Sequence, residues 1–322
     1  MTTPAPEPRA PAPGTAPTPK DKESVEPDAV IDPRFGIVPA ELAALDLEDE
    51  DEPDELPSIR DVGQSLPIGY YDASGKLHRD FSVVDWDWEV EEELGELAEK
   101  NEDMGMGVYI SEVIGTAISK LGELDFTRLK RSQRRLVISR LFYSDAIYVY
   151  VHARIAALGA HIRFERFKCE KCRKPTDFVG DLRTLEVKAY PEGELPRKTV
   201  ELERAFTYGG KEIEKVVVGP LKWAFMETDD VSNLTNPAKF RLHTLRNGIV
   251  GLEGIDEGIP IVLTREHAKS LGPAAINRLV REIDSLGGGA VMECAGQCIS
   301  CRTEFRRAID WTYDNFFGRS SQ

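Results

Sequence analysis

Five cysteines, arranged as two spaced pairs and one extra thiol, constrain the fold of this chain more than any other feature. Cys169-x-x-Cys172 and Cys298-x-x-Cys301 stand 125 residues apart. Zinc(II) favours four soft ligands in a tetrahedron, and a C-x-x-C turn directs two thiolates at one ion. The segments "KCEKCRKPTDF" and "QCISCRTEF" therefore predict the two knuckles of one zinc ribbon, with these four cysteines as ligands of a structural Zn²⁺.

Two other uses of these thiols remain open from the sequence, namely a redox-active C-x-x-C and buried inert cysteines. A redox pair is typical of a thioredoxin-like βαβ unit, which the surrounding pattern does not indicate. His161, eight residues before Cys169, is an alternative metal ligand. Four thiolates close the coordination sphere and leave no position for a catalytic water, so the pattern indicates a structural site. The spacing leaves Cys294 as a neighbour of the site.

The first 56 residues differ in composition from the rest of the chain. Seven of the first twenty residues are prolines, and "LDLEDEDEPDEL" follows at residues 45–56. Such a segment has too little apolar surface to offset the entropy of ordering, so we expect residues 1–56 to be a disordered Pro-rich and acidic tail. Within it, Phe35 to Leu45 is either a solvated spacer or a short segment that orders on a partner, for which it carries enough apolar residues.

Charge distribution argues against nucleic acid as the main partner. The formal net charge is -15, and the first hundred residues hold 26 of the 56 Asp and Glu but only 8 of the 41 Lys and Arg. The remaining residues are close to neutral, whereas a protein that binds nucleic acid needs an excess of cations to neutralise phosphates. We do not expect direct binding of DNA or RNA.

Neither a secretory leader nor a membrane span is expected. No apolar run follows Met1. The most apolar stretch, "DAIYVYVHARIAALGA", is interrupted by His152 and Arg154 and is shorter than the roughly 20 apolar residues that a membrane helix needs. The chain is therefore expected to stay in the cytoplasm, without membrane contact.

Residues 57–160 are predicted to form a β-hairpin and a helical region. Two apolar runs flank the turn-forming "DASGK", which predicts strands at 66–71 and 77–84. Apolar residues at helical spacing predict a helix from Trp86 and another over 107–124. One long helix is expected from the capping residue Ser132 to the stop at Gly159.

Residues 161–322 are predicted to form an α+β region enclosed by the zinc ribbon. A strand should lead into the first cysteine pair, and a second hairpin should turn at Gly209-Gly210. A helix over 236–247 would begin with Asn236 as cap, and two helices within 264–286 would be broken at Gly272-Pro273. The expected fold class is α+β, a helical block plus β-hairpins closed by a four-cysteine zinc ribbon.

A basic run lies at residues 128–140, "RLKRSQRRLVISR". It is either a solvated helical face or a binding site for an acidic partner, for this chain's own acidic tail or for nucleic acid. The five histidines form no pattern with Ser, Cys or Asp that would indicate a catalytic triad. No enzymatic activity is expected.

The order of these features resembles a known family over about residues 60–318. The segments "LPIGYYDASGKLHRDF" and "FERFKCEKCRKPTDFVGDLRTL", a β-rich middle, and a final C-x-x-C followed by the aromatic pair Phe316-Phe317 carry the resemblance. This layout is similar to that of zinc-ribbon tail and baseplate assembly proteins of T-even-type contractile phages and related injection systems. That family's knuckles often read C-P-x-C-G, whereas Arg173 and Arg302 replace the glycine here.

The resemblance implies a non-enzymatic assembly factor or structural component of a tail or baseplate. Such a protein would bind other tail or baseplate proteins in the cytoplasm of the bacterial host, and its presence in the finished particle is left open. The alternative is a zinc-ribbon regulator that binds nucleic acid through the basic run at 128–140. Salt-sensitive binding to DNA or RNA would distinguish the second function from the first.

Overall fold

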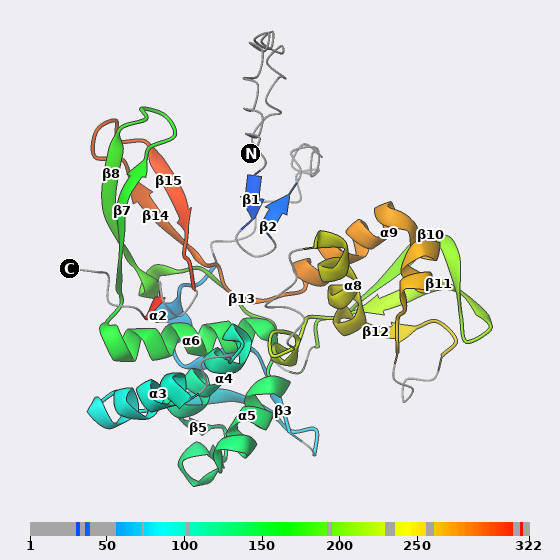
Figure 1. Cartoon of the computed structure of the whole chain (residues 1–322), viewed down its shortest axis with the longest axis horizontal. Helices are drawn as coiled ribbons and strands as arrows, with labels where there is room; N and C mark the ends of the chain where they lie inside the picture. The colour runs from blue at the N-terminus through cyan, green and yellow to red at the C-terminus, as the bar shows by residue number, and fades with distance from the viewer. Residues whose placement is uncertain are drawn as a thin grey trace, which may run out of the picture. The chain divides into compact units, whose positions relative to one another are not determined.

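The structure is a computed structural model of the whole chain (Figure 1). It divides into two units, Met1–Glu52 and Pro53–Gln322. The described residues are 30–32, 36–38, 56–72, 74–100, 104–191, 193, 195–228, 236–255, 261–311 and 316–317.

The smaller unit contains one described strand pair. Strand β1 (Val30–Asp32) pairs antiparallel with β2 (Gly36–Val38). Both strands fall within the segment for which disorder was predicted. The rest of that segment up to residue 55, including most of Phe35 to Leu45, lies outside the described residues.

The larger unit is α+β, as the sequence predicted. Its strands are all paired antiparallel. The α-helices are α2 (Ile59–Val62), α3 (Trp88–Lys100), α4 (Met106–Ala117), α5 (Arg131–Arg140), α6 (Tyr143–Leu158), α8 (Pro237–Gly248) and α9 (Arg265–Ser285). The short 3-10 turns are η1 (Phe126–Arg128), η2 (Leu182–Thr184) and η3 (Trp223–Phe225).

Among the residues described for this unit, the strands form one four-stranded sheet, one three-stranded sheet and three two-stranded sheets. The four-stranded sheet has the order β3 (Ser65–Tyr71), β4 (Leu77–Val83), β5 (Ile118–Leu121), β6 (Leu124–Asp125). The three-stranded sheet has the order β10 (Lys198–Tyr208), β11 (Lys211–Val218), β12 (Ile249–Leu252). The two-stranded sheets pair β7 (His161–Lys168) with β8 (Pro175–Asp181), β9 (Val187–Lys188) with β13 (Gly289–Ala290), and β14 (Glu293–Gln297) with β15 (Glu304–Ala308).

The first hydrophobic core joins helices α3, α4 and α6 to the four-stranded sheet, and the helices lie side by side in Figure 1. Helix α4 buries Ile110, Val113 and Ile114 completely, and these apolar residues recur at the spacing of one helical face. Helix α6 is buried around most of its circumference. No helix among the residues that the structure describes is long and apolar enough to cross a membrane.

The second hydrophobic core lies between the three-stranded sheet and helices α8 and α9. Strands β10 and β11 meet at the predicted Gly209-Gly210 turn, where both glycines have positive φ. Asn236 caps α8 by accepting hydrogen bonds from the backbone N–H of Ala238 and Lys239. Helix α9 is broken at Gly272, whose φ of 76° is not helical. These elements confirm the predictions for this part of the chain.

The single long helix predicted from Ser132 to Gly159 is wrong, because it is two helices. Leu141 and Phe142 between them are extended, with ψ of 153° and 148°. The Leu141 carbonyl accepts from the Trp223 N–H, and Phe142 forms a β-bridge with Lys222. Hydrogen bonds to this distant segment replace the helical ones, a tertiary effect that local periodicity does not reveal.

The helix predicted over 107–124 is also too long. Helix α4 ends at Ala117, and residues 118–121 continue as β5 in the four-stranded sheet. Ile118 and Leu121 are still buried, as expected. The three-residue spacing of Ile118 and Leu121 is typical of a helix, but pairing of this segment with β4 makes it a strand.

Asp145 of α6 connects this helix to β3. The pairing of β3 with β4 is irregular between Ser65 and Tyr70. Within that gap, the two Asp145 carboxylate oxygens accept hydrogen bonds of 2.9 Å from the backbone N–H of Ile68 and of Gly69. Asp145 has no solvent exposure. It therefore satisfies two buried backbone donors of β3.

Candidate metal centre

Two hairpins from distant parts of the chain carry the four predicted cysteine ligands, each in the turn between its strands. The first knuckle links β7 to β8 and the second links β14 to β15 (Figure 1). In the first, the Cys169 N–H donates to the Lys174 carbonyl and the Arg173 N–H donates to the Cys169 carbonyl. The second knuckle repeats both hydrogen bonds, from Cys298 to Thr303 and from Arg302 to Cys298. The two turns thus have the same backbone hydrogen-bonding pattern.

The sulfur positions fit a tetrahedral metal site. The Sγ atoms of the four cysteines all lie within 4.8 Å of one another. Cys169 to Cys301 and Cys172 to Cys298 are both 3.7 Å. Ligands at the Zn–S distance of about 2.3 Å on a tetrahedron are about 3.8 Å apart. A disulfide would need about 2.05 Å, so the thiols are free and placed to share one ion.

Both knuckles place an arginine where backbone geometry favours glycine. Arg173 has a φ of 58° and Arg302 a φ of 56°. In the described part of the chain, they are the only non-glycine residues with positive φ. The left-handed conformation costs an ordinary residue about 1–2 kcal/mol. The turns keep this conformation because the cysteine carbonyls accept the arginine N–H groups.

An aromatic cluster joins the two hairpins next to the cysteines. Phe164 and Phe178 stack at 4.4 Å between ring centroids. Phe305 of the second hairpin meets Phe167 and Phe178 edge-on, at 4.9 and 5.0 Å. Gly296 makes room for this contact, because a Cβ there would lie 2.7 Å from the Phe305 ring. The hairpins are therefore held together by apolar packing as well as by the knuckles.

One threonine hydroxyl lies beside each of two cysteines, Cys298 and Cys301. Thr176, which is 2% exposed, has its Oγ1 3.4 Å from the Cys298 Sγ. The Thr303 hydroxyl lies 3.3 Å from the Cys301 Sγ. The hydrogen bond from Thr176, followed by that from the Cys301 backbone N–H, lowers the pKa of the Cys298 thiol to about 6. Groups that stabilise the thiolate favour metal binding, because the thiolate is the ligand.

Replacing Thr176 with Val tests this hydroxyl. The side chains have the same shape, so the hairpin should remain folded while Cys298 loses a donor. We expect metal affinity to fall by about tenfold, the lower end of the range for removal of an outer-shell partner. Competition with a chromogenic chelator measures the affinity. Thr207→Val, at an exposed position of β10, is the control. Equal affinity in both variants would contradict the role assigned to Thr176.

Cys294 lies outside the group of four. It is 3% exposed, belongs to the first hydrophobic core, and packs against Gly180, where an added Cβ would lie 2.5 Å from its Sγ. Burial raises the pKa of its thiol to about 11. His161, the alternative ligand, begins β7, whereas Cys169 follows the last residue of that strand, roughly 25 Å away at the usual rise per residue. In the described residues, the potential metal-binding group contains only the four cysteines.

The basic run at 128–140 is engaged in local interactions. Arg131 pairs with Glu112 at 2.9 Å, and Arg135 lies 3.5 Å from Glu227. Arg134 donates to backbone carbonyls of residues 126 and 129. Carboxylates and carbonyls therefore already bind several of the cations that a phosphate backbone would need.

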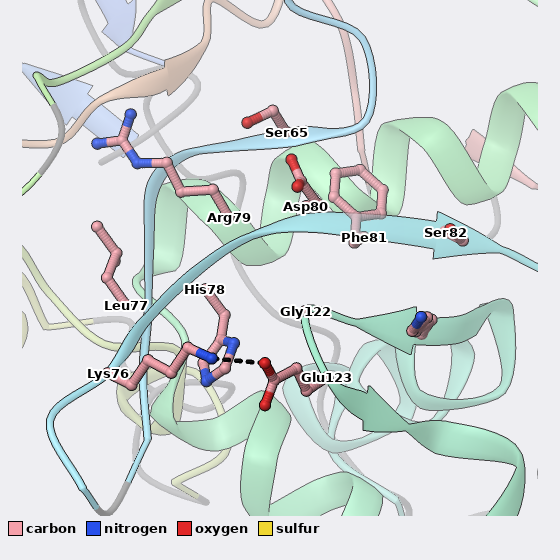
Figure 2. A pocket seen from close by; sticks show the side chains of 11 residues that line it. Ser65, Lys76, Leu77, His78, Arg79, Asp80, Phe81, Ser82, Gly122 and Glu123 are labelled. Atoms are coloured by element: carbon pink, nitrogen blue, oxygen red, sulfur yellow. Dashed lines mark hydrogen bonds and ion pairs between the residues drawn. The ribbon is translucent and has the colours of Figure 1, made fainter.

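A second candidate site is a polar pocket of about 690 Å³ beside β4 and β5 (Figure 2). Figure 2 shows the ion pair between Lys76 and Glu123, which are 2.6 Å apart. His78 is buried and bonds to Asp72 at 3.0 Å. The hydroxyl of Ser74 donates to Asp72 at 2.6 Å.

This order of groups does not match a catalytic triad. In a triad, the imidazole lies between the hydroxyl and the carboxylate so that it can accept the hydroxyl proton. Here the Asp72 carboxylate lies between Ser74 and His78. Hydrogen bonds from His78 and then from Ser74 hold the pKa of Asp72 far below its usual range. The arrangement stabilises the turn between β3 and β4.

The aromatic pair near the C-terminus anchors that end of the chain on α6. Phe316 and Phe317 are 1% and 8% exposed. Tyr150 contacts both rings, at 5.2 and 5.0 Å between centroids. The Arg154 guanidinium donates to the Phe316 carbonyl at 2.6 Å.

Comparison with known proteins does not extend this description. No protein-family model, curated protein or solved structure matches the chain. The four-cysteine centre therefore remains the most informative feature for function.

Proposed function

We propose that this chain is a non-enzymatic assembly factor or structural component of the tail or baseplate of a contractile phage or related injection system, stabilised by a structural Zn²⁺. The observation that carries the proposal is the pair of equivalent knuckles with four thiols within 4.8 Å of one another. Four thiolates would occupy every position around a tetrahedral ion, which favours a structural role over catalysis. The order of sequence features supports the specific assembly.

Arginines of the basic run already form ion pairs with carboxylates elsewhere in the chain, which supports this function over binding of nucleic acid. A regulator that used residues 128–140 would have to exchange the ion pairs of Arg131 and Arg135 for contacts with phosphates. Fluorescence anisotropy with duplex DNA and with single-stranded RNA measures this directly. Salt-sensitive binding that is lost when these arginines are replaced would favour the regulator.

Deletion of the gene in its native host tests the assembly function. Genes for sheath, tube and baseplate proteins are expected beside it. Electron microscopy of lysates should show few complete tails after deletion, and the intact gene should restore them. A gene with Cys169→Ser and Cys298→Ser should not restore them, whereas Cys294→Ser should. Normal particles in the deletion strain would refute the proposal.

A further inference from the structure

A groove lies between helices α8 and α9 and is called here the α8–α9 groove. Its volume is about 540 Å³. The apolar residues that line it are Ala238, Leu242, Ala268, Pro273 and Ile276. The groove borders the break in α9 at Gly272, where the helix axis is interrupted. An apolar groove between two helices is a common binding site for a partner's apolar side chains.

Cations surround this apolar lining. Lys239, Arg241, Arg265 and Lys269 all line the groove, and no carboxylate of the described residues does. Lys269 also lies 3.3 Å from Glu266, but both side chains are 75% exposed. Exposed pairs of this kind contribute little, so Lys269 can exchange this partner for another carboxylate at low cost.

Two helix N-termini add to the positive potential. Helix α8 begins at Pro237, and Asn236 and Ala238 beside it line the groove. The second half of α9 begins at Pro273, which also lines it. Helix N-termini carry a partial positive charge that favours nearby anions. The dipole of α8 and the four side chains therefore act in the same direction, whereas at the break the C-terminus of the first half of α9 offsets the N-terminus of its second half.

We propose that the α8–α9 groove binds an acidic segment of a partner protein. Apolar side chains of that segment would enter between the helices while its carboxylates contact the four cations. Such a segment would use both the apolar lining and the cations of the groove. A phosphate backbone would use the cations and leave the apolar lining exposed, and a purely apolar peptide would leave the cations unpaired. The inference rests on the proposed function only in treating the chain as a protein-binding component.

Peptide binding to the full chain tests the groove. The probe is a fluorescein-labelled synthetic helix in which leucines recur every three and four residues among glutamates, and its counterpart has lysine in place of each glutamate. The acidic peptide should bind, and its affinity should fall at least about tenfold in 0.5 M salt, because exposed charges are then screened. The basic peptide should not bind.

Charge-reversal variants test whether the acidic peptide binds in the α8–α9 groove. Arg241→Glu with Lys269→Glu should weaken the acidic peptide by about tenfold or more. Arg204→Glu with Arg281→Glu changes the net charge equally at exposed positions outside the groove and should have little effect. Leu242→Ser should weaken binding without changing the charge. Circular dichroism confirms that each variant is folded.

Three outcomes would overturn the proposal. The first is that the acidic peptide does not bind at millimolar concentration. The second is that the groove variant and the control variant lose equal affinity for the peptide. The third is that single-stranded DNA displaces the peptide and that binding of this DNA depends on Arg241 and Lys269. The titration contains no tail or baseplate protein. If the peptide does not bind, the deletion test of the assembly function still stands. If the deletion strain forms normal particles, the peptide titration still tests the groove.

Discussion

Replacing Cys169 and Cys298 with serine is expected to reduce zinc from about one ion per chain to nearly none. Each knuckle then loses one thiolate, and the two that remain cannot hold a tetrahedral ion. Structural zinc contributes about 10–16 kcal/mol of apparent binding free energy in zinc-finger peptides. We expect the hairpins β7–β8 and β14–β15 to open and the midpoint of thermal unfolding to fall by at least roughly 10 °C, because a loss of only about 4 kcal/mol, well below that figure, already gives this shift.

Elemental analysis, thermal unfolding and hydrogen exchange measure these three effects. Exchange should increase in the two hairpins and remain slow in α4 and α6, which pack against each other and against the four-stranded sheet in the first core. Cys294→Ser is the matched control, because Cys294 is buried but lies outside the group of four thiols. Full zinc content in the double variant would refute the four-thiolate site.

Replacing Asp145 with leucine is expected to cost about 2–6 kcal/mol of unfolding free energy. Leucine keeps the branched shape of the side chain and removes both acceptors, so the N–H groups of Ile68 and Gly69 are left buried without partners. Each orphaned donor costs about 1–3 kcal/mol. Urea denaturation measures the change. Glu92→Leu, which replaces an exposed carboxylate on α3, should alter stability by less than about 0.5 kcal/mol.

Asp145 should also make the free energy of unfolding depend on pH. Burial raises the pKa of Asp145 to about 7, from a value near 3.8 in the unfolded chain. Between these values the folded protein holds a proton that the unfolded chain has released, so stability falls as pH rises through this range and levels off above it.

Comparison with Asp145→Asn isolates this effect, because the amide does not titrate. Between pH 6 and pH 8, the unfolding free energy of the natural protein should fall relative to the variant by about 1 kcal/mol. This range also keeps the thiols available for metal. Parallel pH dependence of the two proteins would show that Asp145 does not titrate there.

Local sequence signals predicted much of the fold because they depend on near neighbours. The turn at Gly209-Gly210, the cap at Asn236 and the break at Gly272 all follow from the backbone preferences of individual residues. The prediction failed at Leu141, where a distant strand-like segment competes for the backbone hydrogen bonds of a helical sequence.

The candidate ligands were also predictable, because the C-x-x-C spacing positions two thiols without any information about the rest of the chain. The residues that contact these cysteines without being candidate ligands were not predictable from the sequence. Thr176 and Gly180 lie on β8 of the first hairpin, yet they contact Cys298 and Cys294 of the second hairpin, more than a hundred residues later. No sequence signal connects such residues, since the contact exists only when the two hairpins are packed together.

The residues alone were sufficient to predict the two knuckles, several helices and hairpins, and the distinction between four clustered thiols and a fifth. These features arise from covalent spacing and local conformational preference. The packing of distant segments, in contrast, establishes that Asp145 supports β3, that ion pairs engage the basic run, and that four cations line an apolar groove between α8 and α9. Such contacts join residues that are distant in the chain, and their energies depend on burial and distance, which folding alone establishes.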